Sequence, residues 1–433
     1  MSAASESRSI EQAAEPGETL ERPAGIEERS EVVVVGAGMV GAALACLLGG
    51  AGVEVTLVDA RESLLDPEAV GRGQPGMRVS ALTPVSQRLL ERLGVWEWMA
   101  ARRVSPYRHM QVWDAEGSGE VSFSSEQAGV AKLGHIVEND VTQAALEQRL
   151  VSLPSVRLLL GARVTALEAT DGRRYLRLAD GRRLVAPLVV AADGARSPLR
   201  ELAGIETRER DTGHRAVVTT VKVERPHGEV ARQAFLPTGP LAFLPLRIDG
   251  ERHHCSIVWS TSPEEAERLM GLAPEALGNE LAGGIDHRLG EVTVVDRAVA
   301  FPLVQRHAQR YVLPGLALVG DAAHSIHPLA GQGVNLGLMD AAVLAEELLA
   351  ARSRGVSLGD ERWLARYARR RRGDNAGMLA LMDGFRLLFG ASHPALALAR
   401  NLGLGAVDRL TPLKRLMMQQ AIGHRGRLPA SCR

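Results

Sequence analysis

Three glycines with a fixed spacing near the beginning of the chain could hold a phosphate group. Gly36, Gly38 and Gly41 form a G-x-G-x-x-G pattern between a β-branched run at 31–35 and an apolar, helix-like stretch at 42–48. In such a pattern the first glycine makes a tight turn, the second lets the backbone approach a pyrophosphate, and the third lets the helix pack on the strand. The N-terminus of the helix then offers N–H groups and a positive dipole end to the phosphates. The pattern predicts a dinucleotide site, and a glycine-rich turn that binds nothing is the alternative.

An acidic residue stands where such a site binds the ribose. Asp59 ends a second predicted strand, 53–58, and follows Gly41 by 18 residues (59 − 41). A carboxylate at this position can accept hydrogen bonds from a ribose diol. The motif alone does not separate NAD from FAD, because both carry the same adenosine diphosphate half.

Two later segments place a carboxylate and a glycine directly after a predicted strand. Asp193 and Gly194 follow the apolar run 184–192, and Gly320 and Asp321 follow the run 316–319. A carboxylate after a strand can accept a hydrogen bond from a ribityl hydroxyl, and glycines at 331 and 333 let backbone N–H groups approach a flavin ring edge. A helix that begins near Val334 would direct its dipole at the flavin pyrimidine edge, where negative charge accumulates on reduction.

These segments resemble the signatures of a known enzyme family. Residues 190–200 are similar to the Asp-Gly motif of the single-component FAD monooxygenases that hydroxylate aromatic rings, and residues 327–340 resemble the signature of the ubiquinone-pathway branch of that family. The resemblance extends from about residue 31 to residue 425. Shorter segments carry it between the motifs, at 78–82, 93–96, 110–114, 134–139, 241–246 and 256–260. The resemblance implies FAD rather than NAD as the bound dinucleotide, with NAD(P)H as electron donor and O2 as oxidant.

The resemblance also implies which residues bind the cofactor. Arg78 matches an arginine that the family places on the flavin side, with a surface arginine as the alternative, and Glu138 precedes the family's cofactor-lining helix. Asp140 stands where many relatives carry arginine, so we assign it no contact with FAD. The implied cofactor-binding residues are Gly36, Gly38, Gly41, Asp59, Arg78, Glu138, Asp193, Gly194, Gly320, Asp321, Pro328, Gly331, Gly333, Val334 and Asn335. We expect no metal and name no catalytic base; a proton-shuttle role for His324 or His327 is an alternative.

The substrate that the resemblance implies is the ring of a polyprenylated phenol. The short sequence segments 135–139 and 230–233 favour hydroxylation at ring carbon C5, and C6 and C1 stay open as alternatives. Two readings from other classes also stay open: a flavin reductase of the same fold that needs no O2, and a scaffold that keeps FAD only for stability. Other enzymes of the ubiquinone pathway are candidate partners.

Composition excludes several classes of protein. The 51 Lys+Arg residues balance the 51 Asp+Glu residues, so the chain lacks the net positive charge of a nucleic-acid binder. The three cysteines lie far apart and form no C-x-x-C pair, which argues against a disulfide framework or a zinc site and suits a reducing cytoplasm. The uncharged stretch 32–53 is long enough to span a membrane, but its glycines favour a strand, a turn and a helix.

The fold that the resemblance implies is α/β (α+β): a Rossmann-like FAD-binding domain interleaved with an antiparallel-sheet substrate domain, similar to p-hydroxybenzoate hydroxylase. We expect the FAD-binding domain at 31–105, 135–205 and 300–375, the substrate sheet at 106–134 and 206–299, a C-terminal helical region at 376–433 and a disordered tail at 1–30. The basic stretch 378–423 has helical apolar spacing, which indicates packing on the FAD-binding domain or contact with an anionic membrane. We therefore expect a cytoplasmic protein, with peripheral contact at the inner membrane as the alternative.

Overall fold

The computed structural model describes residues 27–325, 333–389, 414, 418–419, 422–423 and 426–433, with side chains of helix α10 described to residue 378. Most of the predicted tail, much of the predicted C-terminal helical region, and Pro328 and Gly331 of the predicted site lie outside these residues. The tail prediction was wrong at its end, because Glu27–Arg29 forms strand β1. This strand pairs in parallel with β12 (Arg183–Ala186) in a sheet of order β1-β12-β11-β10, with β11 at Arg173–Leu178 and β10 at Val164–Thr170.

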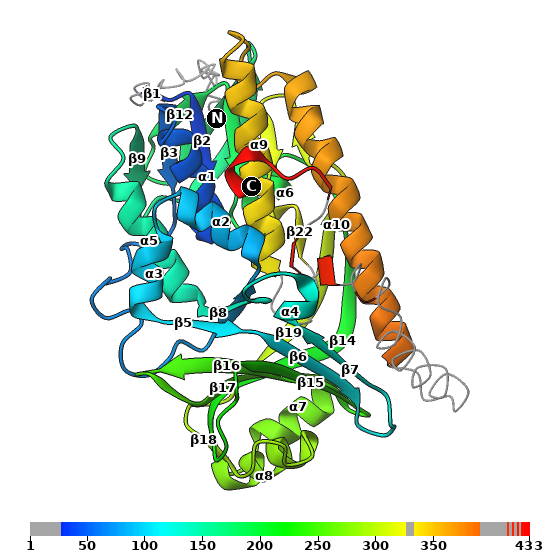
Figure 1. Ribbon diagram of the computed structural model, residues 1–433. Helices are drawn as coiled ribbons and strands as arrows, with labels where there is room; N and C mark the ends of the chain where they lie inside the picture. Colours follow the sequence, from blue (N-terminus) through cyan, green and yellow to red (C-terminus); the bar gives the residue numbers. More distant parts are fainter. Residues whose placement is uncertain (1–26, 326–332, 390–413, 415–417, 420–421, 424–425) are drawn as a thin grey trace, which may run out of the picture.

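A mainly parallel sheet forms the centre of the nucleotide-binding half (Figure 1). Its order is β20 (Val312–Leu313), β21 (Leu316–Leu318), β13 (Leu188–Ala191), β2 (Val32–Val35), β3 (Val55–Val58) and β9 (Val156–Leu159). Strands β2, β3, β13 and β21 are buried throughout, as their runs of valine and leucine predict for a sheet covered on both faces. Helices α1 (Met39–Gly49), α5 (Asn139–Val151) and α9 (Gly333–Arg352) pack beside one another on this half.

The ends of three parallel strands bring the three predicted motifs together. Ala191 at the end of β13 lies in register with Val35 of β2 on one side and Leu318 of β21 on the other. The segments that carry Gly36, Asp193 and Gly320 therefore leave the sheet side by side, although they are far apart in sequence. Carboxyl ends of parallel strands are where open α/β sheets bind ligands.

One predicted strand is two strands in the structure. The apolar run 184–192 breaks at Pro187, which separates β12 in the small sheet from β13 in the parallel sheet. Proline has no N–H to donate to a ladder, so it suits the point where the chain leaves one sheet for another.

A large, mostly antiparallel sheet forms the other half, and a short sheet lies between the halves. The large sheet has the order β22-β19-β14-β17-β16-β15-β6-β7, with β18 paired to β14. Its strands are β6 (His109–Asp114), β7 (Glu120–Ser124), β14 (Thr207–Val223), β15 (Val230–Leu236), β16 (Gly239–Ile248), β17 (Glu251–Thr261), β18 (Val292–Val294), β19 (Val299–Ala308) and β22 (His324–Ser325). The short sheet consists of β4 (Val79–Leu82), β8 (Gly134–Glu138) and β5 (Val104–Tyr107). The predicted end of the substrate sheet at residue 299 was too early, because β19 continues it to residue 308.

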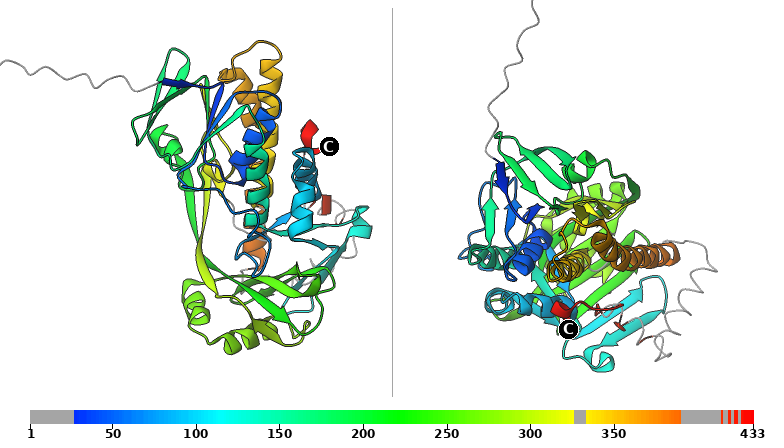
Figure 2. Two further views of the ribbon diagram at one scale, coloured as in Figure 1. Left: turned by 90° about the vertical axis from the view of Figure 1, so that its left-hand side faces the viewer. Right: turned by 90° about the horizontal axis from the view of Figure 1, so that it is seen from above.

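Alternating side chains give the large sheet two different apolar faces. Its outer face, with Leu241 and Phe243 of β16, packs on α7 (Pro263–Met270) and α8 (Pro274–Gly284), which lie on the side away from the nucleotide-binding half in Figures 1 and 2. Its inner face, with Ala242 and Leu244, packs on Ala81 and Ile136 of the short sheet. The period of two along β16 thus fills two separate cores.

Helices around the nucleotide-binding half complete the structure. α10 (Glu361–Phe389) lies along α9 (Figure 1). The other described helices are α2 (Pro84–Arg92), α3 (Trp96–Arg102), α4 (Ser125–Ala128), α6 (Pro198–Leu202) and the 3-10 turns η1 (Gly320–Ala322) and η3 (Ala430–Cys432). Among the helices of the described residues, none has both the length and the apolar content that a bilayer crossing requires.

The crossing of α1 and α9 yields a test of the fold. A Cβ added at Gly337 would lie 2.5 Å from Cγ2 of Val40 and 3.2 Å from Cα of Gly320. We expect Gly337→Ala to lower the free energy of unfolding by about 1–3 kcal/mol through overpacking. Gly373→Ala in α10 is the control, since a Cβ there meets nothing within 4 Å; it should leave stability equal or slightly higher. Equal denaturation midpoints for the two variants would contradict the close helix crossing.

Candidate flavin-binding site

The glycine motif forms an open cradle at the beginning of α1. Gly36 has a φ of +103°, and a Cβ there would collide with the carbonyl oxygen of Ala192. A Cβ at Gly41 would collide with the carbonyl oxygen of Gly36, whereas a Cβ at Gly38 would meet nothing within 4 Å. Gly38 caps α1 without a side-chain hydrogen bond, so the first N–H groups of the helix stay available. The cradle fits a pyrophosphate, as the spacing predicts.

Asp59 closes this cradle from the neighbouring strand. Its carboxylate accepts hydrogen bonds from Ala37 N (2.6 Å) and Arg61 N (2.8 Å). Because each carboxylate oxygen can accept more than one hydrogen bond, Asp59 keeps the capacity to bind a ribose hydroxyl.

A buried network behind the cradle escaped the sequence analysis. Arg61 Nη2 and Gln143 Nε2 both donate to the carbonyl oxygen of Ala37, at 3.1 and 2.7 Å. Arg61 also pairs with the buried Glu147 at 2.9 Å. The spacing of Gln143 and Glu147 by four residues would have placed both on one face of α5, but sequence alone did not indicate which strand they face.

The Asp-Gly motif lies beside the cradle. Asp193 Oδ2 accepts a hydrogen bond from Leu199 N at 3.0 Å, while its buried Oδ1 has no hydrogen bond of acceptable geometry. Burial raises the pKa of Asp193. Gly194 has a φ of +84°, which suits glycine at this turn. The buried Arg200 donates to the carbonyl oxygen of Ala322 at 3.0 Å and so ties this motif to the third.

The third motif presents a carboxylate next to a cation. Gly320, with a φ of +58°, begins η1, and Asp321 follows it with solvent-accessible surface. Protein atoms nevertheless crowd the carboxylate, and this burial raises the pKa of Asp321 against the opposing influence of His324 and Arg78. Arg78 is exposed and close enough to influence the pKa of Asp321 electrostatically, so its guanidinium group is available to a ligand. The predicted flavin-side role of Arg78 stays a prediction.

Two predicted cofactor ligands have structural roles instead. Glu138 is 3 % exposed and accepts hydrogen bonds from Gly76 N (2.6 Å) and Arg103 Nη1 (2.9 Å). The side chain of Asn335 accepts from Thr83 N at 3.0 Å and donates to the carbonyl oxygen of Ala81 at 2.8 Å. Both side chains already form hydrogen bonds within the protein, so they hold the surrounding segments in place, and a contact with the cofactor would fall to their backbone groups; their assignment to the cofactor stays a prediction.

The remaining predicted residues lie at the beginning of α9. Gly333 and Val334 form its first turn, and a Cβ at Gly333 would meet nothing within 4 Å. Asn335 pins this turn to β4 of the short sheet through Ala81. The helix therefore begins where the sequence predicted. Its positive dipole end lies at Gly333 and Val334, where the flavin is expected.

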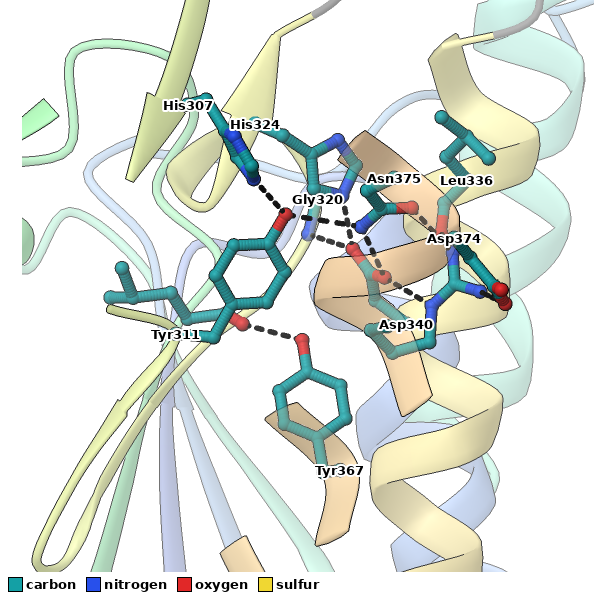
Figure 3. Close-up of polar contacts among 11 residues, drawn as sticks. His307, Tyr311, Gly320, His324, Leu336, Asp340, Tyr367, Asp374 and Asn375 are labelled. Atoms are coloured by element: carbon teal, nitrogen blue, oxygen red, sulfur yellow. Dashed lines mark hydrogen bonds and ion pairs between the residues drawn. The ribbon is translucent and has the colours of Figure 1, made fainter. Parts of the chain in front are cut away.

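A buried carboxylate on α9 holds the third motif from behind (Figure 3). Asp340 is 0 % exposed; it accepts hydrogen bonds from Gly320 N (3.0 Å) and Arg371 Nε (2.7 Å), and its Oδ2 lies 2.6 Å from Nε2 of His324. Burial by itself would raise the pKa of Asp340, but His324 and Arg371 outweigh it and bring the value to about 2. This pairing gives His324 a structural partner, and sequence analysis did not single out Asp340.

Helix α10 contributes one face to the same network. Tyr367, Arg371 and Asn375 follow one another at intervals of four residues, which places them on one face of α10. Tyr367 and Asn375 lie beside Tyr311 and Asp340 in Figure 3, and Arg371 pairs with Asp340 of α9. Tyr367 Oη donates to the carbonyl oxygen of Leu318 at 2.6 Å, and Asn375 Nδ2 lies 3.3 Å from both Asp340 Oδ1 and Tyr311 Oη. The beginning of α10 thus packs on the nucleotide-binding half. The prediction for 378–423 concerns side chains that lie almost entirely outside the described residues, and it stays a prediction.

Taken together, these residues fit FAD. The cradle offers N–H groups for a pyrophosphate, Asp59 and Asp321 offer carboxylates for hydroxyl groups, and Asp193 has a buried oxygen without a hydrogen bond. Arg78 adds a cation beside Asp321. Gly36, Gly38, Asp59, Asp193 and Asp321 would hold the cofactor from the ends of four adjacent strands, β3, β2, β13 and β21.

A substitution at Gly38 can test cofactor binding separately from folding, because a Cβ there meets no protein atom within 4 Å. We expect Gly38→Val to lower FAD affinity at least tenfold, because the added side chain would occupy the space of the pyrophosphate. The free energy of unfolding of the FAD-free protein should change by no more than about 0.5 kcal/mol, since the side chain meets no protein atom. Flavin absorbance after gel filtration, with chemical denaturation of the FAD-free protein, checks both. Full FAD occupancy in this variant would rule out the cradle as the pyrophosphate site.

Removing the charge of Asp340 should destabilise the protein strongly. Asp340→Asn leaves Arg371 buried with an uncharged partner, so we expect the free energy of unfolding to fall by about 3–5 kcal/mol. Asp374→Asn is the matched control, because Asp374 pairs with the same arginine at 3.1 Å but its side chain is 36 % exposed. The control should cost about 1 kcal/mol or less. Similar losses in the two variants would refute the special role of the buried pair.

The low pKa of Asp340 also predicts a pH dependence. A carboxylate whose pKa is lower in the folded state than in the unfolded state stabilises the fold above the unfolded pKa, near 4. That stabilisation should be lost as the pH falls from about 4 toward 2. Denaturation of the wild type and of Asp340→Asn between pH 6 and pH 3 should therefore give stability differences that shrink with acidification, and a constant difference would contradict the assignment.

Comparison with known proteins agrees with this site. The model of the FAD binding domain family matches residues 29–379. The 3-demethoxyubiquinol 3-hydroxylase of Escherichia coli is 41 % identical over 394 residues, covering 91 % of this chain and 98 % of that protein. The ubiquinone hydroxylase UbiL of Rhodospirillum rubrum is also 41 % identical, covering 91 % of this chain and 90 % of that protein. The human mitochondrial ubiquinone biosynthesis monooxygenase COQ6 is 33 % identical, covering 90 % of this chain and 91 % of that protein.

Solved structures show the same fold. The p-nitrophenol 4-monooxygenase PnpA of Pseudomonas putida superposes with a TM-score of 0.74 at 21 % identity, covering 93 % of this chain and all of that chain. The probable FAD-dependent monooxygenase pqsL of Pseudomonas aeruginosa gives 0.71 at 24 % identity, covering 88 % of this chain and all of that one. The predicted fold class and the predicted FAD cofactor are confirmed. With its glycine cradle, the carboxylates that follow its strands and these relatives, the chain belongs to the FAD binding domain family and is an FAD-dependent aromatic hydroxylase.

Proposed function

We propose that this protein hydroxylates the ring of a polyprenylated phenol or benzoquinol in ubiquinone biosynthesis, with NAD(P)H and O2. The observation that carries the proposal is the apolar inner face of the large sheet, which includes Ala216, Val218, Ala242, Leu244 and Val258. Ala216, Val218, Ala242 and Leu244 are already buried, so they mark an apolar region of the molecule beside the short sheet rather than an open groove. Apolar surroundings of this kind suit a substrate that carries an isoprenoid chain, because contact with apolar groups stabilises such a chain. The names of the relatives at 41 % identity support the same substrate class.

The short sheet links this face to the beginning of α9, where the flavin is expected. Ala81 packs on the inner face with its side chain, while its carbonyl oxygen accepts a hydrogen bond from Asn335 at the beginning of α9. FAD, when bound, supplies the reduction of O2 and the transfer of one oxygen atom. The protein then has to orient the ring carbon and exclude water, and the apolar walls on both sides of the short sheet suit that task.

The ring position that we propose is C5, with C6 and C1 as the alternatives. The phrases at 135–139 and 230–233 favour C5, which is the position we propose. The likeness to a 3-demethoxyubiquinol 3-hydroxylase favours the position that this name states. Ile136, Ala231 and Gln233, which belong to the two phrases, border a cavity beside the short sheet, so this cavity is where we expect the choice to be made.

Membrane contact and partner enzymes are part of the proposal. Arg362, Arg366, Arg369 and Arg372 of α10 are exposed and recur at intervals of three or four residues, so they can share one side of the helix. Basic side chains near an anionic leaflet contribute about 1 kcal/mol each to binding. Peripheral contact would bring the protein to a lipid-soluble substrate without a membrane-spanning helix.

Complementation tests the proposal. In bacterial strains that lack their own C5 hydroxylase, the wild-type gene should restore ubiquinone, measured by mass spectrometry, and Asp321→Ala should abolish the restoration. Parallel strains that lack the C6 or C1 hydroxylase distinguish the ring positions. Purified protein should consume NAD(P)H in an O2-dependent way with hydroxylation of the ring. Ring reduction without O2 would identify a reductase instead, and bound FAD that NAD(P)H does not reduce would identify a scaffold.

A further inference from the structure

A small cavity lies between the short sheet and the inner face of the large sheet. Its volume is about 20 Å³, and Ala81, Met110, Ile136 and Leu244 give it apolar walls. A space of this size accommodates one oxygen atom with its hydrogen, comparable to a single water molecule, and not an aromatic ring.

Two polar side chains border this apolar space without a hydrogen-bond partner. Tyr107 of β5 and Gln233 of β15 both line the cavity, and Gln233 is 7 % exposed. Within the part of the chain that the structure describes, neither the Tyr107 hydroxyl nor the Gln233 amide forms a hydrogen bond. Gln233 is buried and Tyr107 is half-buried, and the polar atoms of both keep some accessible surface, so a ligand that enters the cavity can form a hydrogen bond with each of them without displacing an internal partner.

The strand register fixes the direction of Gln233. Gln233 pairs with Ala242, and both lie on the inner face, whereas the next residue, Ala234, packs on the outer face. Arg232 also borders the cavity, but alternation directs its side chain to the outer face, where it interacts electrostatically with Cys255. The groups that face the cavity are therefore neutral, which suits a ring oxygen rather than a carboxylate.

Tyr107 is fixed from the opposite side. Its ring packs against Gly134, where an added Cβ would lie 2.8 Å from the hydroxyl oxygen. Burial raises the pKa of Tyr107 to about 12, so the hydroxyl stays protonated and can donate. The amide of Gln233 can donate and accept. Together they can accept a hydrogen bond from a phenol and donate one to its oxygen.

Ala81 connects the cavity with the beginning of α9, where the flavin is expected. The side chain of Ala81 forms part of the cavity wall, and its carbonyl oxygen accepts a hydrogen bond from Asn335 of α9 at 2.8 Å. An oxygen atom held in this cavity would therefore have a fixed position relative to the beginning of α9.

We infer that Tyr107 and Gln233 form a subsite that binds one ring oxygen of the aromatic substrate and so determines which ring carbon is presented for hydroxylation. This inference rests on the proposed function. Tyr107 and Gln233 act as positioning residues that touch the substrate through its oxygen.

A binding cycle with two probes tests the subsite in the FAD-loaded protein. The probes are 2-prenylphenol, which carries the ring hydroxyl, and prenylbenzene, which lacks it. We expect Gln233→Met and Tyr107→Phe each to weaken 2-prenylphenol binding about tenfold, which corresponds to about 1.4 kcal/mol, and to leave prenylbenzene binding unchanged. Gln148→Met on the exposed side of α5 and Tyr175→Phe on β11 make the same chemical changes away from the cavity and should alter neither affinity.

Turnover supplies an independent readout. In the cavity variants we expect a larger share of NAD(P)H to yield H2O2, or a shift of the hydroxylated ring carbon, at unchanged FAD content. If the substitutions weakened the binding of both probes equally, the inference would be overturned, because the residues would then only shape an apolar wall. Unchanged binding of 2-prenylphenol would overturn it as well. Wild-type protein that binds 2-prenylphenol through the two residues but hydroxylates no ring would instead contradict the proposed function and leave the subsite standing.

Discussion

The site depends above all on the buried contact of Asp340 with Arg371 and His324. Burying a carboxylate is costly unless charged and hydrogen-bonding partners surround it. Here the partners come from α10, from β22 and from the backbone of Gly320, so one side chain joins four segments. The segment that presents Asp321 is therefore held from behind by groups that need not contact a ligand. Loss of this contact would release the third motif, even though the glycine cradle would stay intact.

The parallel register explains why the cofactor residues converge. Val35, Ala191 and Leu318 lie side by side, so the turns after them meet at one edge of the sheet. Close packing then leaves room only for glycine at several points: a Cβ at Gly36 would collide with the strand beside it, and one at Gly337 would separate α1 from α9. Gly38 differs, because it has free space in front of it. Close packing therefore requires glycine at positions 36 and 337, whereas glycine at position 38 leaves room for a ligand.

The two halves of the molecule contribute different chemistry. The nucleotide-binding half gathers carboxylates and N–H groups at strand ends, while the large sheet offers an apolar inner face to the short sheet. The short sheet touches both, since Ala81 packs on the large sheet and accepts a hydrogen bond from Asn335. This arrangement places two neutral polar side chains, Tyr107 and Gln233, at the cavity beside the apolar face, where they can select the orientation of a ring.

The sequence by itself determined the local elements and the cofactor. The glycine spacing, the acidic residues after strands and the beginning of α9 are short-range features, and short-range sterics and hydrogen bonding decide them. It also indicated the fold class, through the order of strands and helices. The tail at Glu27–Arg29 and the extent of β19 were misjudged, because pairing with distant strands decides both. Only the tertiary structure decided which polar side chains face a ligand and which face the protein. Glu138 and Asn335 turned inward to Arg103 and Ala81, whereas Tyr107 and Gln233 converge on one cavity from distant parts of the chain. Long-range packing sets these directions, and no local pattern in the chain encodes them.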